Sequence, residues 1–296
     1  MCMNNNIYGR IIRGIGGFYY VDTGKEIITC RARGKLRKLG KTPCVGDIAE
    51  VSLQNDGNGY LINICQRRNN MVRPPISNID TIAIVASKAA PETDTFFIDR
   101  ISVIAKKNNI DVMLIINKCD ADFAKELYEI YTNVGIDVFR VSAINGEGID
   151  ALKEKLSGKL TAFTGNSGVG KSTLINALIP EAELKTGEIN DKIGRGRHTT
   201  RQVEIIKLTG DTWIADTPGF SAFNIEQNDE ITCQNLVEMF PEFVLHAEKC
   251  RFTGCSHIID SGCEVINAVE NGKIEKTRYE SYKRLYEELN SIPKYK

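Results

Sequence analysis

Short runs of alternating apolar and polar residues characterise the first part of the chain, residues 1–70. Glycine, aspartate and asparagine separate the runs, and this pattern is typical of β-strands joined by turns. The five runs are IYGRIIR, GFYYVD, EIITCRA, DIAEVSL and GYLINICQ. Five short strands with a basic loop predict an all-β barrel of the oligonucleotide-binding (OB) type. Periodicity alone does not separate this barrel from other small barrels.

The pattern changes over residues 71–222, where buried-strand runs alternate with helical ones. Residues 68–78, RNNMVRPPISN, contain two prolines and predict a linker into this part. The expected strands are 79–87, 111–117, 137–143 and 160–165, and the expected helices are 95–109, 122–135 and 149–157. The alternation predicts an α/β domain, in which helices cover both faces of a parallel sheet and ligands bind at the carboxyl ends of the strands.

The last part, residues 223–296, is expected to be mostly helical and to end in a charged helix at 273–289. Four of its apolar residues can share one helical face. They are Ile274, Tyr282, Leu285 and Leu289. We expect this helix to pack on its own domain.

A glycine-rich loop, GNSGVGKS at 165–172, follows one expected strand and opens a helix. Glycines let backbone N–H groups turn towards phosphates, and a helix N-terminus favours anions. Lys171 is expected to reach the β- and γ-phosphates, and Ser172 to bind Mg²⁺. The alternative, a chance glycine loop, does not explain the strand and helix around it. The expected nucleotide contacts here are Gly165, Asn166, Ser167, Gly168, Val169, Gly170, Lys171, Ser172 and Thr173.

A second motif, DTPG at 216–219, ends the apolar run WIAD. Asp216 is placed to hold the Mg²⁺ shell, and the Gly219 N–H to meet the γ-phosphate. Alone, this motif is often only a turn; beside a phosphate loop it indicates a nucleoside triphosphate site.

Base choice is predicted from NKCD, which follows a buried strand. The Asp120 carboxylate can accept hydrogen bonds from N1–H and the 2-amino group of guanine, neither of which adenine offers. Asn117 and Lys118 would brace the loop and cover the ring, with Cys119 between them and Asp120. Ser142 and Ala143 fit a second base loop that offers a backbone N–H to guanine O6. NKCD alone could be an ordinary turn, but all these motifs fall on one predicted sheet.

The order of these loops is a rotation of the usual GTPase order, which starts at the phosphate loop. Here the base loops come first and the DTPG motif comes last. The rotation leaves each strand in place, and it joins the γ-phosphate sensor directly to the cysteine-rich part. Movement of that loop is expected to move the C-terminal domain.

Composition indicates the class of protein and its cellular compartment. Hydrophobic residues make up 42% and charged residues 26% of the 296 positions, as in soluble globular proteins. The chain has no apolar run of the ~18–20 residues that span a bilayer, and its start has no signal-peptide core. We expect a cytoplasmic protein. A membrane-associated signalling GTPase is disfavoured, because no lipidation motif or amphipathic anchor is present.

Cysteine spacing predicts a metal site near the end of the chain. Three of the nine cysteines crowd together with a histidine, in the pattern Cys250-x4-Cys255-x-His257-x5-Cys263. Three thiolates and an imidazole are typical of one structural Zn²⁺. Metal binding would help so small a segment to fold. The alternative is a set of buried free cysteines.

Charge is uneven although the net charge is zero. Residues 25–41 contain many basic side chains, and such a cluster can neutralise RNA phosphates. The candidate RNA-binding residues are Arg31, Arg33, Lys35, Arg37 and Lys38. The alternative is a solvated loop without a partner.

Together, GNSGVGKST, NKCD, DTPGF, GRGRHTTR and the cysteine pattern resemble the circularly permuted, ribosome small-subunit-dependent GTPase A family. The resemblance covers essentially the whole chain: a barrel over 1–70, a permuted G domain over 71–222 and a zinc domain over 223–296. It implies a GTPase that acts late in maturation of the small (30S) ribosomal subunit, is stimulated by that subunit, and contacts it through the barrel and the zinc domain. We expect a monomer that binds GTP, GDP and ribosomal RNA. The alternative function is an RNA-binding assembly factor that only senses GTP or GDP.

The sequence departs from that family, and from many GTPases, at two places. Asp260-Ser261-Gly262 stands where the family often has Glu-Pro-Gly, which predicts a less rigid zinc loop. Phe220 stands where many GTPases carry a water-orienting Gln, so another group must act. The resemblance implies that His198 orients the attacking water, and Lys171 is the other candidate catalytic residue. The alternative is that His198 is only a loop residue. Thr199 or Thr200 would bind Mg²⁺, with Thr200 favoured, and Arg195 and Arg197 would bind phosphate or RNA.

Overall fold

The computed structural model describes residues 7–34, 36, 42–54, 57–179, 203–217 and 231–291. Its chain divides into two compact units. One comprises Met1–Ile82, Ala151–Thr164 and Ile175–Phe220, and the other comprises Ala83–Asp150, Gly165–Leu174 and Ser221–Lys296. Several predicted site residues lie outside the described residues: Lys35, Arg37, Lys38, the whole of 194–201, Gly219 and Phe220.

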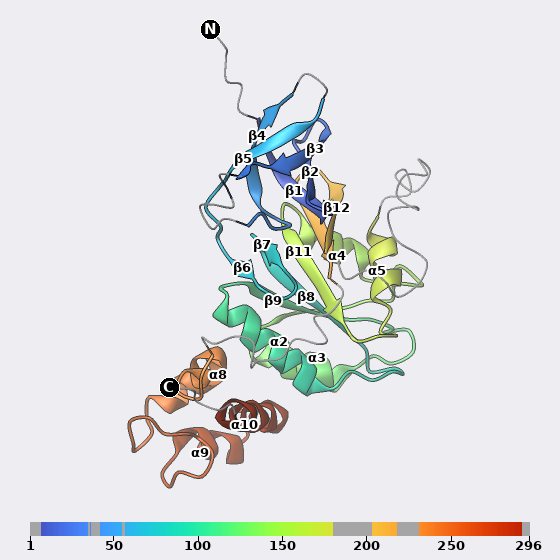
Figure 1. Ribbon diagram of the computed structural model, residues 1–296. Helices are drawn as coiled ribbons and strands as arrows, with labels where there is room; N and C mark the ends of the chain where they lie inside the picture. Colours follow the sequence, from blue (N-terminus) through green and yellow to red (C-terminus); the bar gives the residue numbers. More distant parts are fainter. Residues whose placement is uncertain are drawn as a thin grey trace. The chain divides into compact units, whose positions relative to one another are not determined.

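Five strands near the N-terminus form a closed barrel in the order β1-β2-β3-β5-β4 (blue in Figure 1). They are β1 (Ile7–Ile15), β2 (Phe18–Asp22), β3 (Ile27–Ala32), β4 (Ile48–Leu53) and β5 (Gly59–Ile64). Pairing of β1 with β4 closes the barrel. Alternation along the strands directs Ile11, Val21 and Leu61 into a core that includes Cys30. The predicted OB-type barrel is confirmed.

The predicted linker is more ordered than its prolines suggested. β6 (Asn70–Met71) pairs antiparallel with β7 (Ile76–Ser77), and Met71 and Ile76 are buried. Asn69 brackets this hairpin: its amide accepts from the N–H of Ile79 and donates to the Ile79 carbonyl at 2.7 Å. Residues 68–78 thus contain a short hairpin held by the Asn69 amide, rather than an open, unpaired chain.

The second sheet has six strands in the order β10-β9-β8-β11-β13-β12. They are β8 (Thr81–Ala86), β9 (Asp111–Ile116), β10 (Asp137–Arg140), β11 (Leu160–Gly165), β12 (Glu204–Thr209) and β13 (Thr212–Asp216). β9 is parallel to β10, and β11 is parallel to β13. β12 is antiparallel to β13, so the expectation of a wholly parallel sheet was wrong at this edge. The edge strand escaped prediction because half-buried polar residues interrupt its apolar run.

Helices alternate with these strands as predicted. They are α2 (Thr95–Lys107), α3 (Lys125–Asn133), α4 (Ile149–Leu156) and α5 (Lys171–Leu178). The carboxylate of Asp94 caps α2 by accepting the N–H of Phe96. Over the described part of the chain, no helix combines the length and apolar character that a bilayer crossing requires.

The C-terminal part is helical (orange to dark red in Figure 1). Its elements are η3 (Leu236–Met239), α8 (Pro241–Ala247), α9 (Glu264–Glu270) and α10 (Lys276–Ser291). An aromatic cluster forms its centre: the ring centroids of Phe240 and Phe243 lie 5.0 Å apart, and that of Tyr282 lies 5.4 and 5.2 Å from them. Such edge-to-face and tilted contacts stabilise a small core.

α10 packs against α2 as well as within the C-terminal part, contrary to the expectation that it packs only on its own domain. The buried Arg278 guanidinium of α10 donates to Asp99 of α2 at 2.6 Å and to Glu242 of α8 at 2.7 Å. Burial opposes its charge, but Asp99 and Glu242 outweigh this effect and raise the pKa of Arg278. Arg100 of α2 makes a second link to Glu288.

Replacing Arg278 by methionine is expected to lower the free energy of opening of α10 by about 3–5 kcal/mol, because Asp99 would remain buried without its partner. Amide hydrogen exchange in α2 and α10 measures this change. Arg284→Met is the matched control, because Arg284 lies on the same helix but is exposed, 3.8 Å from Asp94. Equal effects of the two substitutions would contradict a special role of the buried pair. Adding Asp99→Asn to Arg278→Met should restore part of the loss.

Candidate nucleotide and metal sites

The phosphate loop, residues 165–172, joins β11 to α5 through two glycines in the left-handed region. Gly168 has φ of 85° and Gly170 has φ of 89°, values that side chains rarely adopt. A Cβ at Gly165 would lie 2.5 Å from the carbonyl oxygen of Val85. Val169 is buried, whereas Ser172 and Thr173 at the start of α5 are exposed. The loop is anchored by one apolar side chain and presents its hydroxyl groups outward.

The base loop, residues 117–120, begins where β9 ends. Lys118 has φ of 65°, an uncommon conformation without glycine, and its Nζ donates to the Ala90 carbonyl at 2.8 Å. The N–H of Cys119 donates to the Val141 carbonyl at 3.1 Å. These bonds hold the loop while Asp120 is exposed. Ala90 was not predicted from the sequence, because no pattern marks a backbone carbonyl 28 residues away.

Asn117 joins three loops through one buried amide. Its Nδ2 donates to the Val169 carbonyl in the phosphate loop at 3.0 Å, and its Oδ1 accepts the N–H of Ala143 at 3.0 Å. A Cβ at Gly170 would lie 2.4 Å from Nδ2, so glycine is needed for this approach. The structure thus brings together the predicted base loop, second base loop and phosphate loop.

The second base loop follows β10, at Ser142 and Ala143. Ser142 is buried, and its hydroxyl accepts the N–H of Asn145 at 3.3 Å. Ile144 is 78% exposed, so this loop presents an apolar side chain to solvent next to the predicted guanine contact. A planar base could cover such a side chain.

Asp216 is the last residue of β13 and pairs in register with Phe163 of β11. The hydroxyl of Thr217 donates to the Phe163 carbonyl at 2.8 Å, which fixes the chain just after the strand. The remaining DTPG residues, Pro218 and Gly219, fall outside the described residues, as does the whole of the predicted switch I loop with His198, Thr199 and Thr200.

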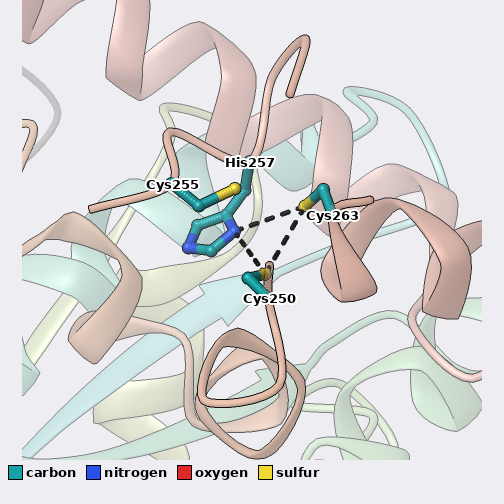
Figure 2. Close-up of side chains that lie close together, drawn as sticks. All are labelled: Cys250, Cys255, His257 and Cys263. Atoms are coloured by element: carbon teal, nitrogen blue, oxygen red, sulfur yellow. Dashed lines mark hydrogen bonds between the residues drawn. The ribbon is translucent and has the colours of Figure 1, made fainter. Parts of the chain in front are cut away.

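The four predicted metal ligands converge in the C-terminal part (Figure 2). Their donor atoms all lie within 4.8 Å of one another. The Sγ atoms of Cys250 and Cys263 are 3.9 Å apart, and His257 Nδ1 lies 3.6 Å and 3.4 Å from them. Tetrahedral Zn²⁺ with ordinary bond lengths separates two sulfurs by about 3.8 Å and a sulfur and a nitrogen by about 3.6 Å. The cluster therefore fits one tetrahedral metal ion.

Backbone and charge around the cluster also suit a metal. His257 has φ of 61°, a strained left-handed conformation that a functional loop can retain. Burial lowers the pKa of the His257 imidazole, which favours the neutral, metal-binding form. The N–H of Glu264 points at Cys250 Sγ, 3.4 Å away, where it can stabilise a thiolate.

Three residues that support this cluster were not predicted as site residues. Tyr279 and Tyr282 of α10 donate their hydroxyl groups to the carbonyls of His257 and Ser256, at 2.9 and 3.1 Å. Asp260 accepts from the N–H of Ser256 at 2.9 Å and from its hydroxyl. These bonds lower the pKa of the Asp260 carboxyl. Of these three, only Tyr282 was expected on the apolar face of the helix, a pattern that indicates packing but not which loop the residue supports.

Of the five candidate RNA-binding residues, Arg31 and Arg33 are described, and both are exposed. The guanidinium carbon of Arg31 lies 4.5 Å from the ring centroid of Phe18, and that of Arg33 lies 5.7 Å from that of Tyr60. The basic surface of the barrel is therefore interleaved with aromatic rings.

Comparison with known proteins places these features in a family. The family model described as RsgA GTPase matches residues 64–226, and the RsgA N-terminal domain model matches residues 8–61. Two relatives named "Small ribosomal subunit biogenesis GTPase RsgA" cover 97% of this chain. That of Caldanaerobacter subterraneus subsp. tengcongensis is 44% identical, with 97% of its own length covered, and that of Ruminiclostridium cellulolyticum is 41% identical, with 95% covered.

Solved structures agree with the sequence comparison. The crystal structure of YjeQ from Thermotoga maritima is 33% identical, with a TM-score of 0.83 over 97% of this chain and 100% of that one. YloQ, described as a circularly permuted GTPase, is 33% identical, with a TM-score of 0.79 over 99% of both chains. The predicted permuted G domain is confirmed by these matches.

Proposed function

This chain belongs to the RsgA GTPase family, and from that premise we propose that it hydrolyses GTP as an assembly factor of the small ribosomal subunit. The relatives are named for biogenesis of that subunit. The observation that carries the nucleotide assignment is the Asn117 amide, which bonds to both the phosphate loop and the second base loop. A guanine nucleotide bound across these loops would contact the base loops through its base and the phosphate loop through its phosphates.

Roles for the individual residues follow from their chemistry. Asp120 would select guanine, the backbone and Lys171 would hold the phosphates, and Ser172 and Asp216 would bind Mg²⁺ together with Thr200. The Cys250, Cys255, His257 and Cys263 cluster would hold one structural Zn²⁺. Arg31 and Arg33, with the neighbouring basic residues, would contact ribosomal RNA. We propose domain boundaries near 70 and 222, a monomer, and action in the cytoplasm, where the subunit is assembled.

The joint between α2 and α10 supports coupling of nucleotide state to the C-terminal part. α2 follows the loop whose Ala90 carbonyl accepts Lys118 of the base loop. The same helix holds the buried Arg278 of α10 through Asp99. A nucleotide-dependent shift of the base loop would therefore reach the zinc cluster through packed elements.

Multiple-turnover GTP hydrolysis with and without purified small subunits tests this proposal. We expect slow turnover alone and faster turnover with the subunit. Nucleotide-dependent association with the subunit, without multiple turnover, would instead favour the alternative of a factor that only senses GTP or GDP. Small subunits that change neither turnover nor association would contradict both.

His198→Ala is expected to leave GTP affinity and subunit binding unchanged but to lower subunit-stimulated turnover by about 100-fold, as expected for loss of a group that orients or deprotonates water. The reason is that Phe220 cannot orient water. Stimulated turnover and sedimentation with subunits should be measured on the same protein. His246→Ala, in α8, is the control histidine. Full stimulation of the His198 variant would remove His198 from the mechanism.

A further inference from the structure

The outer face of the barrel carries a row in which an arginine lies between two aromatic residues. Strand register pairs Phe18 of β2 with Arg31 of β3, and Arg31 with Tyr60 of β5. Cys30 and Leu61, their neighbours along the strands, point into the core. Side chains alternate along a strand, so Arg31 and Tyr60 point outward, and both are exposed.

Each ring of this face has an arginine beside it. Arg31 lies 4.5 Å from the centroid of Phe18, and Arg33 lies 5.7 Å from that of Tyr60. Two register pairs further along β2, Tyr20 faces Thr29, and Arg13 lies 5.7 Å from the Tyr20 centroid; this pair lines a separate pocket, in which Arg13 lies 3.7 Å from Glu204. Aromatic rings and guanidinium planes are the surfaces on which unpaired bases stack, and the neighbouring charges can neutralise phosphates.

A shallow pocket of 280 Å³ lies over the row. It is lined by Phe18, Thr29, Arg31, Gln54, Asn58 and Tyr60, together with backbone of Gly59. No acidic side chain is among these lining residues, and the two amides are of the type that bonds to base edges. The volume is below the about 300–1,000 Å³ of sites for drug-sized ligands. Size, charge and lining therefore suit one flat, polar ring next to a phosphate.

We propose that the Phe18–Arg31–Tyr60 row binds an unpaired RNA base. The base stacks on Phe18 or Tyr60, and Arg31 and Arg33 neutralise the adjoining phosphates. In a duplex the base faces are already stacked, so only an unpaired nucleotide can use these rings. The inference rests on the proposed function in one respect: ribosomal RNA would supply the base. It goes further by naming the RNA element, an unpaired loop or bulge, and the residues that contact it.

Binding of short labelled oligoribonucleotides to the full-length protein tests the row by fluorescence anisotropy. We expect an unstructured strand to bind more tightly than the same sequence in a duplex. Phe18→Leu and Tyr60→Leu should each weaken single-strand binding by about 5- to 150-fold, the effect of losing one stacked base. Tyr8→Leu is the matched control, because Tyr8 is an exposed tyrosine of the barrel, 52% accessible, that does not line the pocket.

The salt dependence of RNA affinity distinguishes the contribution of the aromatic rings from that of the arginines. Phe18→Leu should leave the slope of log affinity against log salt unchanged, whereas Arg31→Gln should lower its magnitude by about 0.7 for a single strand. If Phe18→Leu and Tyr60→Leu bind the single strand as tightly as Tyr8→Leu does, the row does not stack a base. Equal losses of affinity for single-stranded and duplex RNA would likewise overturn the proposal. The rings would then support the barrel fold or contact the sugar-phosphate backbone of the RNA.

Photo-crosslinking of the unaltered protein to RNA that contains 5-iodouridine gives a test that does not depend on variants folding. Crosslinks at Phe18 or Tyr60 are expected, and crosslinks confined to other elements would overturn the proposal. Small-subunit stimulation of GTP turnover is measured in parallel. If small subunits stimulate GTP turnover but the Phe18 and Tyr60 substitutions do not weaken RNA binding, this inference alone is rejected. If small subunits do not stimulate GTP turnover of the unaltered protein, the proposed function is rejected.

Discussion

Asp120→Asn is expected to reduce the affinity for GTP by roughly 10⁴-fold, the discrimination typical of sites that lose a required polar partner. The Asp120 side chain lies exposed at the end of the base loop, after the strand β9. A carboxylate accepts both guanine donors, whereas an amide offers one acceptor and sets its own N–H₂ group against the other donor. Xanthosine triphosphate carries a carbonyl at that position and should bind the variant better than GTP does.

Nucleotide binding by the purified variant, measured for GTP, xanthosine triphosphate and ATP, gives the result directly. Asp122→Asn is the matched control: Asp122 lies two residues away in the same loop, and its carboxylate accepts the N–H of Ala124. Asparagine can also accept that N–H in the same turn, so the control should retain its GTP preference. Unchanged GTP preference in Asp120→Asn would show that the base lies elsewhere.

The loops of this site were predictable because their chemistry is local. GNSGVGKS needs glycine at the two left-handed positions, 168 and 170, and lies between a strand and a helix. NKCD likewise follows a buried strand. The order of these motifs along the chain predicted the permuted domain, since motif order is read directly from sequence.

The features that were missed depend on distant parts of the chain meeting in space. Arg278 contacts Asp99 across 179 positions, and no local pattern distinguishes it from the other charged residues of α10. The packing of α10 on α2 was therefore not predicted. β12 was missed for a different reason: an edge strand has polar residues on its exposed face, so its apolar signal is weak. The row of Phe18, Arg31 and Tyr60 requires strand register, which periodicity does not supply.

Cys255→Ser is expected to weaken zinc retention by more than the about 10- to 100-fold that follows loss of an outer partner of a metal site, because it removes a direct ligand. The remaining ligands, Cys250, His257 and Cys263, would hold a three-coordinate ion with an open position. Zinc content after dialysis against a chelator measures retention. Cys233→Ser is the control, because that thiol lies in the same part of the chain but outside the cluster.

The same substitution should loosen the C-terminal part selectively. Apparent free energies of structural zinc binding reach about 10–16 kcal/mol at pH 7. Zinc binding would therefore supply much of the free energy that stabilises so small a domain. Tyr279 and Tyr282 bond to the backbone of the ligand loop, so loss of the metal should free α10 on the side that faces the cluster. Hydrogen exchange should therefore rise in α9 and α10 well before β8, β9 and β11. Uniform loss of protection would indicate that Cys255 supports the whole chain, and zinc content equal to that of Cys233→Ser would exclude Cys255 as a ligand.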